Sequence, residues 1–264
     1  MKTSTEKMIA EKDGMIGWMT FNNEARRNAL SLDMYQAVPE IMAEFEADGE
    51  IRVIILRGAG NKAFISGADI STFEKNRSSA EDAANWNATT SKAGNSVSDA
   101  LKPTIAMIDG FCMGGGVTMA MSCDLRIASE KSRFAVPAAK LGVGYGAGGL
   151  MKLMLAVNPS SAKEIFFTAR QFSAEEALGM GWINRVVPDE QLEGYVREYA
   201  QTIAANAPLT IRAVKETVRE LSKDPAEREL ERSEALVTAC FSSEDYVEGR
   251  RAFMEKRPPE FKGK

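Results

Sequence analysis

Three successive glycines, Gly114, Gly115 and Gly116, form the segment whose residue types best suit chemistry. They follow an apolar stretch, 104–108, that we expect to be a buried strand, and they lead into VTMAMS, which can form a helix. Glycine permits a sharp turn and lets a ligand approach the backbone closely. The first amides of a helix have no partner inside it and attract negative charge. The run therefore fits an anion or an oxyanion developing on a carbonyl. The alternative is a tight strand-to-helix turn without a ligand.

Two other small-residue turns have the same character. The stretch LGVGYGAGG, 141–149, contains five glycines among nine residues, and Tyr145 is its only large polar side chain. The stretch SGAD, 66–69, follows the apolar run 53–56 and leads towards helical sequence. Packing alone does not require so much glycine, so we expect the backbone to surround a ligand here.

The chain contains no histidine. This excludes Ser-His-Asp and Cys-His nucleophile systems, zinc held by histidine, and histidine general bases. Proton transfer must then use carboxylates, tyrosine, lysine, cysteine or water. We expect no metal site.

Composition indicates a soluble globular protein of 264 residues with a sizeable core. The net charge of −4 gives no basic bias, so we expect no nucleic-acid partner. No apolar run is long enough to span a membrane, and the N-terminus resembles neither a secretory signal nor a transit peptide. Three cysteines are too few for a disulfide framework, so we expect a reduced, cytoplasmic setting.

The elements that must position these turns follow from periodicity and capping signals. We expect strands at 15–21, 53–56, 104–108, 125–128 and 183–187. We expect a helix capped by Ser31 and disturbed by Pro39, and helices beginning after Asn158 and Ser173. The polar segment 71–100 reads as mobile, partly helical, and a lid or wall beside a site. From residue 190 onwards the sequence predicts helices broken at Pro208 and Pro225.

Together these stretches resemble the crotonase superfamily, the enoyl-CoA hydratase/isomerase family. The matching segments occur in family order over nearly the whole chain: NEARRNAL, AFISGADI, KPTIAMIDGFCMGGGVTMAMSCDLRIAS, FAVPAAKLG, GAGG, ARQFSAEEALGMGWINRVV and EDYVEGRRAFMEKRPPEF. The resemblance implies an α/β fold, the ClpP/crotonase-like spiral of ββα units, over residues 1–200. It also implies a helical trimerisation region over 201–264, and hence a homotrimer or a hexamer formed as a dimer of trimers.

By the same resemblance the ligand is an acyl-CoA thioester, as in fatty acid metabolism, with coenzyme A entering only as part of the substrate and no other cofactor. The family's oxyanion hole, made of two backbone amides, corresponds to Ala68 and Gly115. These two and Tyr145 are the expected catalytic positions. The resemblance assigns substrate binding to Arg26, Ala29, Ala63, Ser66, Asp69, Ile70, Gly114, Thr118, Ala138, Phe253 and Lys256. Phe253 and Lys256 match residues that often reach coenzyme A in the adjacent protomer. Without the family resemblance, Arg26 and Lys256 would be read as solvated surface charges.

The two glutamates of the family's hydratases have no counterpart, because their positions hold Thr118 and Ala138. Hydration needs a base for water and an acid for the α-carbon. The sequence therefore predicts that the protein is not an efficient conventional hydratase. Because alanine replaces a glutamate at position 138, we do not expect simple isomerisation either.

Two alternatives remain open at this stage. The pattern LGVGY resembles that of methylmalonyl-CoA decarboxylases, whose tyrosine lies at the active site, so Tyr145 suits a decarboxylase-like lyase. Loss of CO₂ generates the enolate without a carboxylate base. Alternatively, the Tyr145 side chain only forms part of the wall of the acyl pocket and has no role in the chemistry. The second alternative is a non-catalytic acyl-CoA-binding protein.

Overall fold

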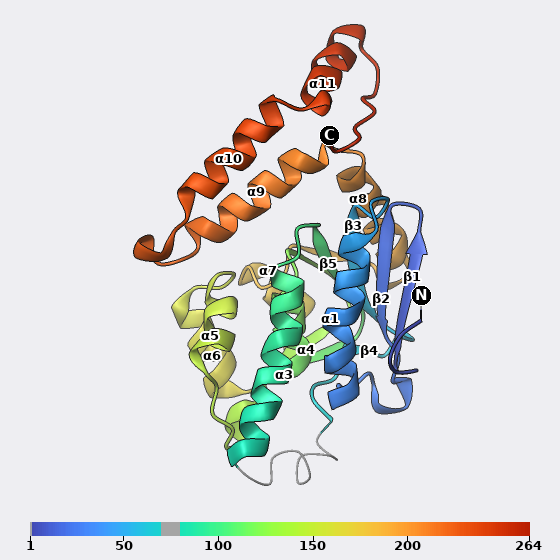
Figure 1. Cartoon of the computed structure of the whole chain (residues 1–264). Coiled ribbons are helices and arrows are strands. Elements are labelled where there is room, and N and C mark those ends of the chain that lie inside the picture. The colour runs from blue at the N-terminus through green and yellow to red at the C-terminus, as the bar shows by residue number, and fades with distance from the viewer. Residues whose placement is uncertain (1, 70–79) are drawn as a thin grey trace.

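The computed structural model describes residues 2–69 and 80–264. Three successive strand–strand–helix units build its centre (Figure 1): β3, β4 and α3, then β5, β6 and α4, then β7, β8 and α5. In each unit the first strand joins one sheet and the second strand joins another. This is the predicted spiral of ββα units.

The larger sheet has six strands. Its order is β1 (Met8–Asp13), β2 (Ile16–Phe21), β3 (Val53–Gly58), β5 (Thr104–Ile108), β7 (Leu125–Ser129) and β10 (Arg185–Val187). All neighbours are parallel except the β1–β2 hairpin. A parallel sheet needs covering on both faces, which explains the unbroken apolar run at 53–56.

The two faces of this sheet pack against different partners. Ile54 and Leu56 join the main core with α1 (Leu32–Ala47), whereas Val53 and Ile55 face α8 (Leu192–Ala204). This alternation follows the period of two along a strand.

The smaller sheet contains the strands that lead into the site. Its order is β4 (Ala63–Ile65), β6 (Phe111–Met113), β8 (Arg133–Ala135) and β9 (Phe172–Ser173). Helix α4 (Gly115–Met121) starts two residues after β6, as the glycine run predicted. Helix α3 (Ala80–Ser98) lies beside α1 and confirms the helical part of the segment 71–100; residues 70–79 lie outside the described residues.

Two predicted helix starts are confirmed in atomic detail. The Asn158 side chain accepts a hydrogen bond from the Ser161 amide at 2.9 Å and caps α6 (Pro159–Thr168). Ser173 and Glu176 form a reciprocal capping box at α7 (Ala174–Gly179). The remaining element of this region, α5, covers Ala147–Met154.

The C-terminal part is helical, as predicted. After α8 come α9 (Pro208–Leu221), α10 (Leu230–Phe241) and α11 (Glu244–Glu255). Helices α9 and α10 lie antiparallel beside each other and extend away from the sheets (Figure 1). The breaks fall at Pro208 and Pro225, where the sequence placed them.

Three details differ from expectation. Strand β1 was not predicted, because its exposed alternate residues weaken the apolar signal. Helix α1 runs continuously through Pro39, since buried residues on either side, among them Val38 and Ile41, hold it to the core. The division at residue 200 falls inside α8, which remains packed on the large sheet as far as Ala204.

Candidate active site

A cavity of about 920 Å³ lies where β4, β6, α1, α3, α4 and α5 meet. Ten of the residues expected at the site line it: Arg26, Ala29, Ser66, Ala68, Asp69, Gly114, Gly115, Thr118, Ala138 and Tyr145. All three glycine-rich turns singled out in the sequence contribute to its wall.

Ala68 lines this cavity, and its amide takes no part in the backbone hydrogen bonds that hold its neighbours. Ala68 and Leu30 form an isolated parallel bridge, in which the Leu30 amide donates to the Gly67 carbonyl and the Asp69 amide donates to the Leu30 carbonyl, both at 2.8 Å. In such a bridge the central residue turns its own N–H to the opposite side. Gly67 has φ of 123°, a conformation that a side chain would strain.

The loop before Leu30 is fixed by Asn28, which is buried with φ of 56°. Its side-chain amide donates to the carbonyls of Ala59 and Ala63 at 2.9 and 2.8 Å. Its side-chain oxygen accepts from the Asn23 amide at 3.0 Å. The Asn28 side chain therefore links this loop to the start of β4 and indirectly positions Ala68.

The second amide belongs to Gly115 at the start of α4. The turn is anchored by the Gly114 amide, which donates to the Ala135 carbonyl at 2.9 Å. Gly116 packs so closely on β4 that a Cβ would lie 2.3 Å from the Ile65 carbonyl oxygen. A Cβ on Gly115 would lie 3.6 Å from the Ala68 backbone nitrogen. The structure thus brings these two residues together.

Neither the Ala68 nor the Gly115 amide donates a backbone hydrogen bond to any residue in the described ranges 2–69 and 80–264. Two adjacent unpaired amides on a cavity wall can hold an oxygen that gains negative charge. Removing either donor would weaken that stabilisation by about 3 kcal/mol.

Tyr35, a residue of α1, also belongs to this wall. Its hydroxyl would lie 2.6 Å from a Cβ on Gly115, and its ring packs edge-on against Trp86 at 5.7 Å. A tyrosine among apolar residues at helical spacing gave no signal for a site, because the pattern is that of a core-facing helix.

Tyr145 approaches α4 one turn beyond Gly115. Its hydroxyl lies 3.4 Å from the Thr118 hydroxyl, and its ring packs edge-on against Phe166 at 4.8 Å. Thr118 also lies 3.5 Å from the Gly114 carbonyl, the contact expected of a threonine satisfied by its own helix. The two hydroxyls form a polar part of the cavity wall one helical turn from Gly115.

Acidic groups are scarce here. Among the described residues that line the cavity, Asp69 is the one carboxylate, and it pairs with Arg26 at 3.1 Å. Ala138 lines the cavity and has no group for proton transfer. Burial raises the pKa of the Cys123 thiol to about 12 and also raises that of Cys112, so neither supplies a thiolate.

Other expected residues lie apart from the cavity. Ala63 is buried within β4, so its side chain has no surface for coenzyme A. Ile70 lies outside the described residues. Phe253 and Lys256 are on and just after α11, away from the amide pair (Figure 1), and their contact with coenzyme A of a neighbouring subunit stays a prediction.

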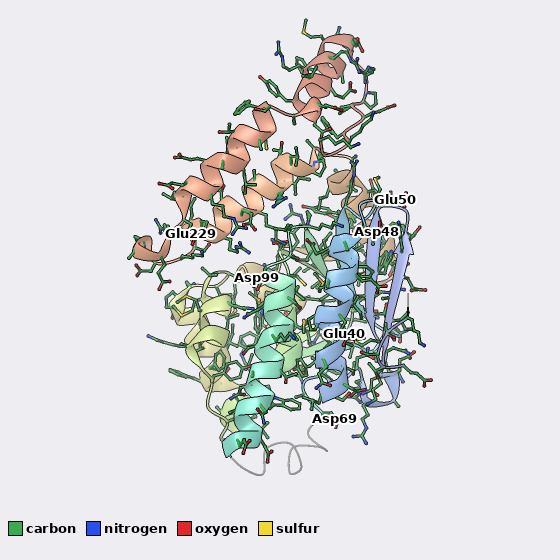
Figure 2. The ribbon with its side chains drawn as sticks, in the orientation of Figure 1. Glu40, Asp48, Glu50, Asp69, Asp99 and Glu229 are labelled. Atoms are coloured by element: carbon green, nitrogen blue, oxygen red, sulfur yellow. The ribbon has the colours of Figure 1, made fainter. Side chains whose placement is uncertain are left out.

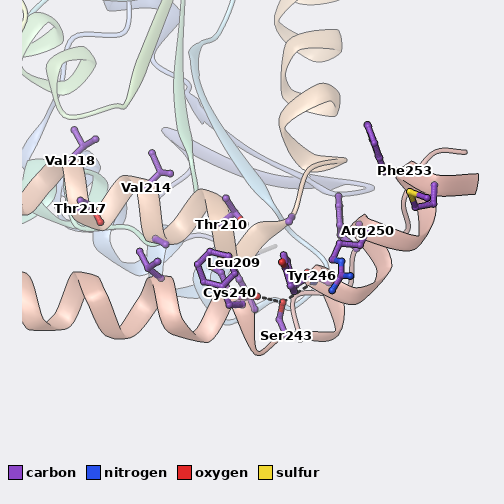
Figure 3. Close-up of a pocket in the computed structure, with 18 residues that line it drawn as sticks. Leu209, Thr210, Val214, Thr217, Val218, Cys240, Ser243, Tyr246, Arg250 and Phe253 are labelled. Atoms are coloured by element: carbon purple, nitrogen blue, oxygen red, sulfur yellow. Dashed lines mark hydrogen bonds between the residues drawn. The ribbon is translucent and has the colours of Figure 1, made fainter. Parts of the chain in front are cut away.

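A second, largely apolar groove of about 1050 Å³ lies between α9, α10 and α11 (Figure 3). Val214, Val218 and Phe253 line it and are each more than half exposed. Figure 3 shows the Ser243 side chain, which caps α11 through the Tyr246 amide at 3.0 Å. None of the residues of the three glycine-rich turns lines this groove.

Comparison with known proteins identifies the family to which this chain belongs. The family model for enoyl-CoA hydratase/isomerase matches residues 11–264. The chain is 35% identical over 250 residues to a short-chain-enoyl-CoA hydratase of Clostridium acetobutylicum, covering 95% of each chain. It is 35% identical over 265 residues to a carnitinyl-CoA dehydratase of Salmonella enteritidis, covering 98% of this chain and 100% of that one.

A solved structure from this family is also similar to the chain. An enoyl-CoA hydratase/isomerase family protein from Hyphomonas neptunium superposes with a TM-score of 0.93 and 36% identity, covering 98% of this chain and 99% of that chain. The protein therefore belongs to the enoyl-CoA hydratase/isomerase family of the crotonase superfamily and has its fold. It is an acyl-CoA enzyme of this family. Within the described ranges, no helix is both long enough and apolar enough to cross a membrane.

Proposed function

We propose that the protein is an acyl-CoA lyase or isomerase that polarises a thioester carbonyl with the amides of Ala68 and Gly115 and stabilises the resulting enolate. The juxtaposition of these two unpaired amides on one cavity wall is the observation that supports this function. Arg26, more than half exposed beside Asp69 at the cavity rim, suits the phosphates of coenzyme A.

We further propose that addition of water to crotonyl-CoA is slow. That reaction requires a general base and a general acid beside the enolate carbons. The described wall offers the paired Asp69, six hydroxyls and one lysine instead of a carboxylate pair. The relatives named as hydratase and dehydratase make water chemistry the competing reaction, so the assay must include it directly.

Decarboxylation of a malonyl-type thioester is the second candidate function. The contact of 3.4 Å between Tyr145 and Thr118 favours it, because two hydroxyls can orient a carboxylate without repelling it. The C–C bond electrons would pass to the thioester as CO₂ leaves, giving an enolate at the amide pair, and a proton from a hydroxyl or water would complete the product.

A panel of crotonyl-CoA, a 3-enoyl-CoA and methylmalonyl-CoA tests both proposals. Turnover of crotonyl-CoA at ordinary hydratase rates would refute the argument from the missing carboxylates. Turnover of methylmalonyl-CoA would select decarboxylation. Tight binding without turnover of any member would identify a non-catalytic acyl-CoA-binding protein.

We also propose that a second copy of the chain covers the apolar groove of α9–α11, giving a trimer or a dimer of trimers. Exposed apolar side chains such as Phe241, Phe253 and Met254 support an interface there. Sedimentation at several concentrations measures the state, and a monomer throughout would contradict the proposal.

A further inference from the structure

Lys152 is a cation in the active-site cavity that the chemistry above does not use. It extends from α5, and its Nζ lies 3.1 Å from the Ser122 hydroxyl and 3.4 Å from both Asn95 Oδ1 and the Ser98 hydroxyl. The Ser122 hydroxyl donates to the Thr118 carbonyl at 3.0 Å, so its oxygen is oriented to accept from the ammonium. Each of these three acceptors is neutral.

The charge of Lys152 has no carboxylate partner within 4.0 Å in the described part of the chain. Asp99 is the carboxylate with the strongest electrostatic effect on Lys152. Figure 2 places Asp99 at the end of α3, where it pairs with Arg219 at 3.5 Å. Burial lowers the pKa of Lys152. An ammonium in this position is stabilised when an anion enters the cavity beside it.

The wall opposite α5 is also polar. Helix α3 lines the cavity with Asn87, Thr90, Ser91 and Asn95, whose successive spacings of three, one and four residues place them on one face. A hydrocarbon chain would remove these amides and hydroxyls from water without replacing their hydrogen bonds. A carboxylate would accept hydrogen bonds from them.

The position of Lys152 sets the length of the ligand. Gly115 and Thr118 lie on α4 and Ser122 is its C-cap residue, and seven residues of helix span about 10 Å. Lys152 therefore lies well beyond the α- and β-carbons of a thioester bound at the Gly115 amide. An acyl chain of about six carbons brings a terminal carboxylate within reach of the ammonium.

We propose that Lys152 determines substrate specificity by binding the distal carboxylate of a dicarboxylic acyl group, so that the substrate is a dicarboxylyl-CoA thioester. This inference rests on the proposed function only in placing the thioester at Ala68 and Gly115. The distal carboxylate is separate from any carboxylate lost at the α-carbon, because it lies at the other end of the acyl chain.

Calorimetric titration of the full chain with adipyl-CoA, hexanoyl-CoA and free coenzyme A tests the inference, since saturated chains give binding without turnover. We expect adipyl-CoA to bind about 10- to 100-fold more tightly than hexanoyl-CoA, as for a charge-assisted hydrogen bond. Equal affinity for the two thioesters, both tighter than coenzyme A, would overturn the inference and leave the acyl-CoA site intact. If neither binds more tightly than coenzyme A, the inference and the proposed acyl site both fail.

Three variants assign the effect to this side chain. Lys152→Met should remove the preference for adipyl-CoA, and Lys152→Arg should retain part of it because the charge remains. Lys163→Met, at an exposed position of α6, is the matched control and should keep the wild-type ratio of affinities. A Lys152→Met protein that keeps the full preference would overturn the role of Lys152, whatever its thermal stability.

Discussion

Placing one methyl group on Gly115 tests the oxyanion hole directly. In Gly115→Ala the new Cβ would lie 3.6 Å from the Ala68 nitrogen, beside the space that the thioester oxygen must occupy between the two amides. It would also lie 2.6 Å from the Tyr35 hydroxyl, so the tyrosine must shift. The backbone tolerates alanine, because Gly115 is not among the residues with positive φ.

The expected loss follows from the number of donors removed. If the methyl group displaces the oxygen from one amide, enolate stabilisation falls by about 3 kcal/mol. At 1.36 kcal/mol per pKa unit, the pKa of the α-carbon in bound acetoacetyl-CoA should rise by about 2. Overpacking against Tyr35 should separately lower the free energy of unfolding by about 1–3 kcal/mol.

The near-ultraviolet band of the acetoacetyl-CoA enolate measures this pKa in the bound state. The double variant Gly115→Ala with Tyr35→Phe should recover thermal stability, because the clashing oxygen is gone, while the enolate pKa stays high. Gly194→Ala in α8, where a Cβ meets nothing within 4 Å, is the matched control and should leave the enolate unchanged. A wild-type enolate pKa in Gly115→Ala would refute the assignment of this amide.

Four further outcomes follow from individual contacts. Tyr145→Phe should lower kcat for the reaction found in the substrate panel by at least about 10-fold while KM changes little, and unchanged activity would reduce Tyr145 to a wall of the pocket. Asn28→Ala should cost about 3 kcal/mol in chemical denaturation, since it leaves the buried Ala63 carbonyl unpaired, together with the half-buried Ala59 carbonyl and Asn23 amide; a loss below about 1 kcal/mol would contradict this. Cys123, with its pKa raised to about 12, should react with a disulfide reagent at mildly alkaline pH only as the protein unfolds, so rapid labelling of the native chain would contradict its burial. Arg257 lowers the pKa of Glu248, so this pair stabilises α11 above the ordinary glutamate pKa of 4.5 and less as pH falls below it; melting curves of Glu248→Gln should lose that acid dependence.

Much of this architecture could be predicted because local rules and tertiary packing agree. The glycine run at 114–116 could be assigned to a strand-to-helix turn, and the caps at Asn158 and Ser173 form the hydrogen bonds that their residue types predict. The apolar run 53–56 is buried on both faces. In each case the residues that specify the structure are adjacent in sequence.

Side chains that reach the cavity from distant elements were harder to predict. Tyr35 reads as part of a core-facing stripe, and only the folded chain brings its hydroxyl against Gly115. Lys152 is one of many lysines in the sequence, and its place in the cavity depends on α3, α4 and α5 meeting. The opposite holds for Phe253 and Lys256. The family resemblance predicts that they bind substrate, although they lie apart from the cavity of their own chain.

Backbone amides and side chains have different roles in the proposed chemistry. This explains why the family can be identified from the chain while the reaction must be determined by an assay. In the proposed chemistry, carbonyl polarisation depends on the amides of Ala68 and Gly115, whose geometry is fixed by the Leu30 bridge and the close packing around α4. Substitution of cavity side chains leaves those amides in place. Proton transfer instead depends on individual groups at Thr118, Ala138 and Tyr145, each of which a single substitution can supply or remove. Resemblance over the whole chain therefore establishes the family but not the reaction, and in the proposed chemistry the residues facing the α- and β-carbons of the enolate decide which product forms.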